Sequence, residues 1–229
     1  MAENEPEKQV KSKQRVADHG EVFTAEREVN AMLDLVKPET ERIDSRFLEP
    51  ACGNGNFLAE ILRRKLAVVE RTYAKNQADY ERYAVLAVSS MYGIDILHDN
   101  VTECRERLYD IFNETYTALY GAICLDECRR SVRFLLETNI VWGDALDFTN
   151  PETKQPLVLA EWSAVSSTMF QRRDYQFRFL VEKTHQFSLF SDEGDPADID
   201  QPVKDYPLVH FLQLSEPSEL SEPRFLQDV

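Results

Sequence analysis

The sequence has no uninterrupted run of about 18 apolar residues, which is the length that a helix needs to span a bilayer. Its first fifteen residues are too rich in charge to contain the apolar core of a secretory signal peptide. We therefore expect a cytoplasmic protein without a membrane span. With 229 residues, of which 43% are hydrophobic, the chain is long enough to bury the core of one domain with tails.

The four cysteines include no Cys-x-x-Cys pair, the spacing typical of zinc and redox sites. Cys124 and Cys128 are four residues apart, which places them on one face of a helix, but no histidine or cysteine cluster stands near them. A chain of this length also gains little from the disulfide bonds that small secreted domains need. We expect reduced thiols that pack in the interior, and we expect no metal site.

Positive charge is scarce, because 26 Lys and Arg residues stand against 41 Asp and Glu residues and give a formal net charge of -15. Proteins gain affinity for phosphate by releasing counterions with Lys and Arg, so this balance disfavours unaided binding to nucleic acid. Small basic groups occur at residues 8–15, 63–65 and 172–173, each compatible with an ordinary solvated face. Any contact with DNA must be local or supplied by a partner.

The pattern along the chain predicts one folded domain between mobile ends. Residues 1–17 are polar and lack periodicity, which is typical of a flexible arm. The domain is expected over residues 18–190, followed over 191–214 by an acidic loop and a last strand near 206–214. Residues 215–229 repeat Ser-Glu-Pro and are expected to form a disordered tail.

Within the domain, short apolar segments alternate with longer amphipathic ones. Strands are predicted over 46–49, 91–96, 139–142 and 157–161, with helical periodicity between the first three. Strands separated by helices of this length favour parallel pairing with right-handed crossovers. The fold class predicted is α/β, a doubly wound and mostly parallel Rossmann-like sheet with helices on both faces.

The two closely spaced glycines, Gly53 and Gly55, follow directly after the first predicted strand. Open α/β sheets bind ligands at the carboxyl ends of their strands, and a glycine there lets a nucleoside approach the backbone. A plain tight turn is the alternative interpretation. The third glycine of the dinucleotide fingerprint is absent, so the turn does not indicate a pyrophosphate site.

Four segments, taken in order, resemble the motifs of one enzyme family. Residues 49–57, Glu-Pro-Ala-Cys-Gly-Asn-Gly-Asn-Phe, closely resemble motif I of the amino-methyltransferases that act on DNA. Residues 19–24 and the helix after them look like motif X of the adenine-specific enzymes of restriction-modification systems. Residues 93–96 are similar to motif II and residues 139–146 to motif III. The resemblance covers roughly residues 15 to 165.

This resemblance implies a site for S-adenosylmethionine. Motif II implies that Asp95 accepts hydrogen bonds from the ribose hydroxyls, and motif III implies that Asp144 accepts one from the adenine amino group. The full set of expected cofactor-binding residues is Phe23, Thr24, Glu49, Ala51, Gly53, Gly55, Phe57, Asp95, Ile96, Asp144 and Ala145.

The catalytic tetrapeptide of that family, Asn/Asp-Pro-Pro-Tyr/Phe, is missing after the fourth predicted strand, where Ala160, Glu161, Trp162 and Ser163 stand instead. Glu161 and Trp162 are candidate catalytic residues, because a carboxylate and an aromatic ring can hold and stack a flipped adenine. A strand end with a packed tryptophan is the alternative. Asn150 precedes Pro151 before the fourth strand, where a turn is the natural interpretation.

Only about 65 residues follow Ser163, and none of them resembles a DNA-reading region. The sequence therefore favours an adenine N6-methyltransferase-like modification subunit that binds S-adenosylmethionine and needs a partner for DNA recognition. Two alternatives stay open at this point. One is a catalytically silent subunit that binds cofactor or serves a structural role, and the other is an acidic interaction protein that binds basic partners or mimics nucleic acid.

Overall fold

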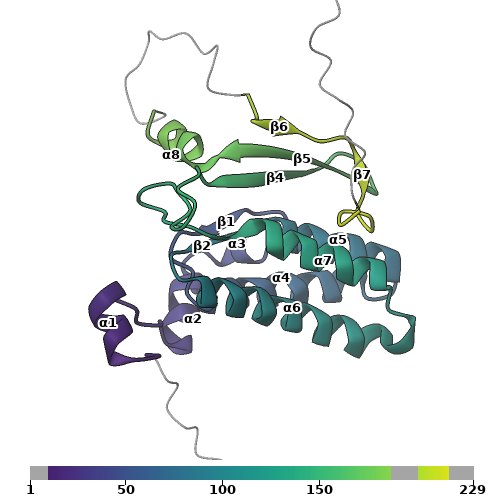
Figure 1. Ribbon diagram of the computed structural model, residues 1–229. Coiled ribbons are helices and arrows are strands. Elements are labelled where there is room, and N and C mark those ends of the chain that lie inside the picture. The colour runs from purple at the N-terminus through teal and green to yellow at the C-terminus, as the bar shows by residue number, and fades with distance from the viewer. Residues whose placement is uncertain (1–9, 187–200, 217–229) are drawn as a thin grey trace, which may run out of the picture.

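The computed structural model describes residues 10–186 and 201–216, and it arranges them in three layers (Figure 1). The middle layer is a parallel sheet of β1 (Phe47–Glu49), β2 (Met91–Asp95) and β3 (Ile140–Trp142), in the order β1-β2-β3. Every residue of β2 is buried, as expected for the central strand of a parallel sheet. These three strands confirm the predicted α/β class and the predicted parallel pairing.

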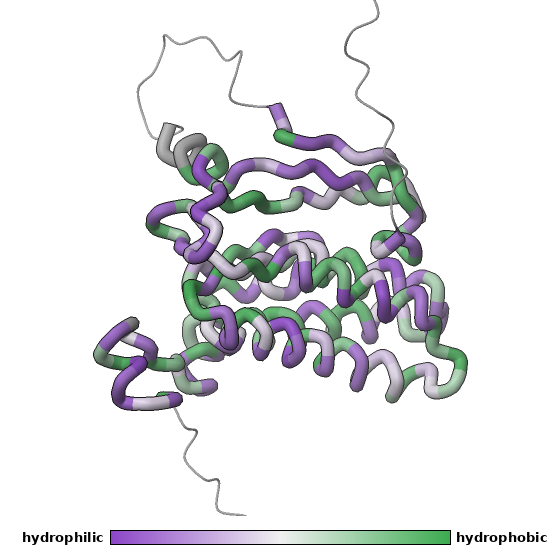
Figure 2. Tube along the Cα trace, viewed as in Figure 1, coloured by the Kyte–Doolittle hydropathy of each residue, from purple (hydrophilic) through white to green (hydrophobic). Residues whose placement is uncertain are grey.

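Two helical crossovers connect the strands. The first contains α4 (Asn56–Tyr73) and α5 (Gln77–Ser89), and the second contains α6 (His98–Tyr120), the 3-10 turn η1 (Gly121–Ile123) and α7 (Asp126–Asn139). Hydrophobic and hydrophilic residues alternate along the turns of these helices (Figure 2), because each helix buries one stripe in the core. The stripe of α4 includes Leu58, Leu62, Leu66 and Val69, all at most 2% exposed.

The N-terminal segment is more ordered than the sequence predicts. Helix α1 (Lys13–His19) begins at Ser12, whose side chain accepts a hydrogen bond from the Arg15 backbone, and ends at Gly20 in the left-handed conformation. The prediction of a flexible arm over residues 1–17 is therefore wrong from residue 13 onward, while residues 1–9 lie outside the described part. Helices α2 (Glu26–Asp34) and α3 (Lys37–Thr40) follow.

The third layer departs from the predicted fold. The fourth predicted strand is present as β4 (Val158–Ala164), but it pairs antiparallel with β5 (Met169–Gln176) instead of joining the parallel sheet. Short strands β6 (Lys204–Asp205) and β7 (Val209–His210) also pair with β5, and α8 (Phe177–Gln186) follows it. Since β7 lies within residues 206–214, the last predicted strand is confirmed only as this short segment.

This second sheet covers the face of the parallel sheet that the main helices leave open (Figure 1). Ile94 of β2 is buried together with Leu157, Leu159 and Phe177 from the antiparallel layer. The prediction of one doubly wound sheet with helices on both faces is therefore wrong beyond its first three strands. Residues 191–200 of the acidic loop predicted over 191–205 lie outside the described residues, as does the tail beyond Glu216, while β6 occupies the last two residues of that predicted loop.

Among the residues described, no helix combines the length and the apolar character needed to cross a membrane.

Candidate functional site

A cavity of about 680 Å³ lies at the carboxyl ends of the three parallel strands, where open α/β sheets bind their ligands. Its volume falls within the range of about 300–1,000 Å³ that is typical of small-molecule sites. The wall combines four segments that are distant in sequence: the loop after α1, the turn after β1, the end of β2 and the turn after β3. We call it the strand-end cavity.

The strand-end cavity brings together ten of the eleven residues that the sequence suggests for cofactor binding. Those that line it are Phe23, Thr24, Glu49, Ala51, Gly53, Phe57, Asp95, Ile96, Asp144 and Ala145. They come from all four of the motif-like segments, which the resemblance expects to contribute to one site. The sequence prediction and the geometry therefore coincide at one place.

Gly55 is the exception, because a different physical requirement explains why a glycine occupies this position. Its φ is +85°, and a Cβ added there would lie 2.7 Å from Sγ of Cys104 on α6. Gly55 is itself buried and does not line the strand-end cavity. The expectation that it opens space for the cofactor is wrong, because it instead lets α6 pack closely against the turn.

The loop before α2 forms one wall of the strand-end cavity. Phe23 covers the turn at Gly53 so closely that a Cβ on this glycine, whose φ is +52°, would lie 2.9 Å from the phenyl ring. The Asn56 side chain donates a hydrogen bond to the Thr24 carbonyl at 2.8 Å, which holds the loop to the start of α4. Residues 10–25, which we call the strap, therefore close over the turn after β1.

Asp95 occupies the centre of this arrangement, at the end of β2, and is only 7% exposed. Its Oδ2 accepts a hydrogen bond from the Gly53 backbone at 2.8 Å, and its Oδ1 accepts from Leu97 N at 2.9 Å and from Asn100 Nδ2 at 3.2 Å. A carboxylate offers about four acceptor positions, so these three bonds leave Oδ2 with capacity for another donor. Asp95 thus fixes the glycine turn to the sheet and faces the strand-end cavity.

Asp144 plays a similar structural role after β3. Its Oδ1 accepts from the backbone of Leu146 at 2.8 Å and of Asp147 at 3.2 Å, which closes an Asx turn. Within the described part of the chain no donor bonds to its Oδ2. The carboxylate is half-buried and lines the strand-end cavity, so this oxygen can serve a ligand.

The lining is acidic, with Asp18, Glu21, Glu49, Asp95 and Asp144, and it contains no lysine or arginine among the described residues. Burial raises the pKa of Glu49, while a hydrogen bond from the Ala51 backbone opposes that shift. An acidic wall favours a ligand with positive charge. In the part of the chain that is described, no group of three His, Cys, Asp or Glu side chains is placed to hold a metal ion.

The two candidate catalytic residues lie elsewhere and do not face each other. Trp162 is 5% exposed, its Nε1 donates to Asn139 Oδ1 at 2.9 Å, and its ring packs edge-on against Phe134. Because successive side chains of a strand point to opposite faces, Glu161 points away from that core. The hypothesis that Glu161 and Trp162 together hold one base is therefore wrong, and the packed tryptophan is what the structure shows.

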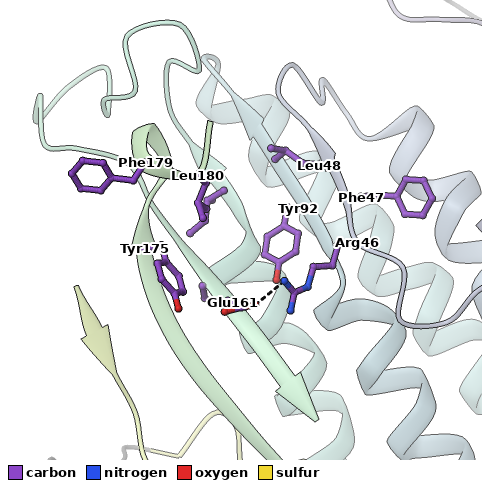
Figure 3. Close-up of a pocket in the computed structure, with 10 residues that line it drawn as sticks. Arg46, Phe47, Leu48, Tyr92, Glu161, Tyr175, Phe179 and Leu180 are labelled. Carbon is purple, nitrogen blue, oxygen red and sulfur yellow. Dashed lines mark ion pairs between the residues drawn. The ribbon is translucent and has the colours of Figure 1, made fainter. Parts of the chain in front are cut away.

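Glu161 instead lines a second, smaller cavity of about 340 Å³ between the two sheets (Figure 3). Its carboxylate meets the Arg46 guanidinium at 2.7 Å, with Tyr92 and Tyr175 close by (Figure 3). Arg46 precedes Glu49 by three residues, which is about 10 Å along a strand. The ion pair therefore lies toward the beginning of β1, away from the strand-end cavity.

Sequence reasoning missed Asn100, which lines the strand-end cavity and is only 1% exposed. Its position invites assignment as a helix cap, but α6 begins earlier, with Leu97 at the N-cap and no side-chain capping bond. The only available signal was its place five residues after Asp95, on the first turns of the following helix.

No protein-family model, no curated protein and no solved structure matches this chain.

Proposed function

We propose that this chain binds S-adenosylmethionine in the strand-end cavity, as an adenine N6-methyltransferase-like modification subunit of a restriction-modification system. One observation carries the proposal. Ten residues, selected from four separate sequence segments because they resemble that family's motifs, line a single cavity at the carboxyl ends of the parallel strands.

The residues present suit this cofactor. Asp95 would accept the ribose hydroxyls through its remaining acceptor capacity, and Asp144 would accept the adenine amino group through Oδ2. Phe23, Phe57 and Ile96 supply apolar contact area. S-adenosylmethionine carries a sulfonium, an ammonium and a carboxylate group, so its net charge is positive and the acidic lining favours it. When bound, it supplies an activated methyl group.

The strand order of the parallel sheet also supports this proposal. In a doubly wound sheet of strand order 3-2-1-4-5-6, the ligand crevice opens beside strand 1, where the order reverses. The observed order β1-β2-β3 with helical crossovers corresponds to the first half of such a sheet. We infer that the chain has this cofactor-binding half and that an antiparallel layer takes the place of the rest.

Transfer to DNA requires more than the chain supplies. A flipped adenine needs acceptors for its amino group and a stacking ring, yet Trp162 is buried in the core and Glu161 is paired with Arg46. A net charge of -15 also opposes contact with phosphates. We propose that a partner subunit provides both the base-holding loop and the basic surface.

A catalytically silent cofactor-binding subunit is the second candidate, and the burial of Trp162 favours it.

Calorimetric titration of the purified chain with S-adenosylmethionine and S-adenosylhomocysteine tests the proposal. We expect saturable binding at one site, and the Asp95→Ala variant should bind roughly ten- to a hundredfold more weakly, since hydrogen bonds to a charged group are worth about 1.5–3 kcal/mol. Asp110→Ala, an exposed carboxylate on α6, is the matched control and should bind like the wild type. Absence of binding to either compound would reject the proposal and leave the acidic interaction protein.

A further inference from the structure

The buried amide of Asn100 uses its whole hydrogen-bonding capacity on groups around the strand-end cavity. Its Nδ2 donates to Glu21 Oε1 at 2.7 Å and to Asp95 Oδ1 at 3.2 Å. Its Oδ1 accepts from Lys11 Nζ at 2.8 Å and from Arg15 Nη2 at 3.1 Å. Two donors and two acceptor positions are all that an amide offers, so the side chain has one defined orientation.

These four partners belong to two different parts of the molecule. Lys11, Arg15 and Glu21 lie on the strap, whereas Asp95 ends β2 and holds the Gly53 backbone. The Arg15 guanidinium meets the Glu21 carboxylate through two bonds, at 2.6 and 2.7 Å, and the Glu21 side chain is only 7% exposed. Paired charge-assisted bonds of this kind fix direction as well as distance. Asn100 is thus the junction between the strap and Asp95.

The charges around the junction explain why an amide stands there. Its donor side faces the carboxylates of Glu21 and Asp95, and its acceptor side faces the cations of Lys11 and Arg15. An aspartate at this position would repel both carboxylates, and an alanine would leave buried groups without their partner. A neutral group with both donors and acceptors satisfies all four at once.

We propose that Asn100 is a positioning residue that orients Asp95 for the ribose hydroxyls and couples ribose binding to closure of the strap. This inference rests on the proposed function. When the strap is closed, Glu21 accepts a hydrogen bond from the Asn100 amide and orients it, and the same amide donates to Oδ1 of Asp95. Oδ2 then keeps its bond to Gly53 and its remaining acceptor position toward the ligand. Opening of the strap removes one of the two acceptors that orient the Asn100 amide.

The first test compares the affinity for S-adenosylhomocysteine of the wild type and of Asn100→Ala by calorimetry. We expect the variant to bind about tenfold more weakly, because a buried hydrogen bond to the ligand-binding carboxylate is lost. Asn113→Ala removes an asparagine about 20 Å further along α6, whose amide bonds to Arg129, and should bind like the wild type. Glu21→Gln perturbs the junction from the strap and should weaken binding in the same direction even if Asn100→Ala folds poorly.

A second ligand separates positioning from general damage. The analogue of S-adenosylhomocysteine without the 2′ and 3′ hydroxyls has nothing for Asp95 to accept, so the wild type and Asn100→Ala should bind it equally. In the Asp95→Ala background, Asn100→Ala should likewise have no further effect on S-adenosylhomocysteine. Equal losses for both ligands, additive losses in the double variant, or wild-type affinity in Asn100→Ala would overturn the inference.

Hydrogen exchange measured without ligand tests the coupling between Asn100 and the strap independently of cofactor binding. Asn100→Ala should speed amide exchange in the strap while Asn113→Ala leaves it unchanged. If the wild type binds no S-adenosylhomocysteine, the proposed function fails and so does the ribose role. Unchanged exchange in the strap of Asn100→Ala would independently refute the coupling.

Discussion

At the level of single residues, the two glycines after β1 allow different close contacts. Gly53 permits Phe23 to lie against the turn at the strand-end cavity, whereas Gly55 permits Cys104 of α6 to pack beneath it. Proximity in sequence made them equivalent candidates for cofactor contact. The packing of α6 separates them, and that packing depends on residues more than forty positions away.

Gly55→Ala should therefore destabilise the protein more than it changes the strand-end cavity. We expect a loss of about 1–3 kcal/mol, from the positive φ and from the contact with Cys104 Sγ. Urea unfolding measures the loss, and the double variant with Cys104→Ala should recover only the packing part. A Gly55→Ala protein of wild-type stability that no longer binds S-adenosylhomocysteine would return Gly55 to the ligand contacts.

Adjacent residues of β4 should respond to substitution in opposite ways. Trp162→Ala should lower the free energy of unfolding by about 3–5 kcal/mol, because it leaves a cavity in the core and removes the hydrogen-bond donor to the buried Asn139 side chain. Glu161→Ala should change stability by less than about 1 kcal/mol, because its ion pair with Arg46 is partly exposed. Thermal or urea unfolding of both variants gives the comparison, and similar losses for the two would contradict the assigned faces.

At the scale of elements, Lys65 of α4 connects the beginnings of β1 and β2. Its side chain is fully buried, and its Nζ donates to the carbonyls of Ile43 and Ser45 and to Ser90 Oγ. Burial lowers the pKa of Lys65 to about 7. In the unfolded chain the pKa returns to about 10.4, so between these values the unfolded state holds a proton that the native state lacks.

Stability carried by this site should accordingly rise with pH, because the native state binds fewer protons than the unfolded state in that window. Relative to Lys65→Met, the free energy of unfolding of the wild type should increase by about 1–3 kcal/mol from about pH 7 to about pH 9. Urea unfolding of both proteins across this range provides the measurement. Parallel pH profiles for the two proteins would show that Lys65 keeps an ordinary pKa.

The elements also show how far the sequence can specify the fold. The first three strands and their crossovers follow from local apolar patterns such as residues 91–95, which are buried on both faces. Strand β5 could not be predicted from local apolar patterns, because the polar residues at its centre are typical of a solvated loop. These residues are Gln171, Arg172, Arg173 and Asp174. Asp174 is 6% exposed and is paired with Arg172, which also stacks on Trp162, so these charges are partly buried by contacts that only the folded sheet creates.

The sequence likewise suggested some residues of the site and missed others. Asp95 and Asp144 were suggested by the resemblance to motifs II and III, and both lie at the edge of the sheet where β2 and β3 end. The pairing of Glu161 with Trp162 was wrong, because the alternation of side chains along β4 and the burial of Trp162 override their proximity in sequence. Asn100 escaped notice because its role depends on the position of the strap.

At the scale of the whole molecule, acidity and the missing base-holding loop predict inactivity in isolation. The purified chain should transfer no labelled methyl group from S-adenosylmethionine to duplex DNA, because unstacking a base costs a few kcal/mol and a charge of -15 recovers little of it. Filter-bound radioactivity after incubation provides the assay. Incorporation by the chain alone, abolished in Asp95→Ala, would contradict the need for a partner.

If the cofactor occupies the strand-end cavity, hydrogen exchange with and without saturating S-adenosylhomocysteine should locate it there. A bound ligand slows the opening of the segments that it contacts. We predict slower exchange in four segments, residues 20–24, 51–57, 95–100 and 143–146, with little change in β4 and β5. No protection anywhere, or protection confined to the smaller cavity around Arg46 and Glu161, would show that the cofactor does not bind in the strand-end cavity.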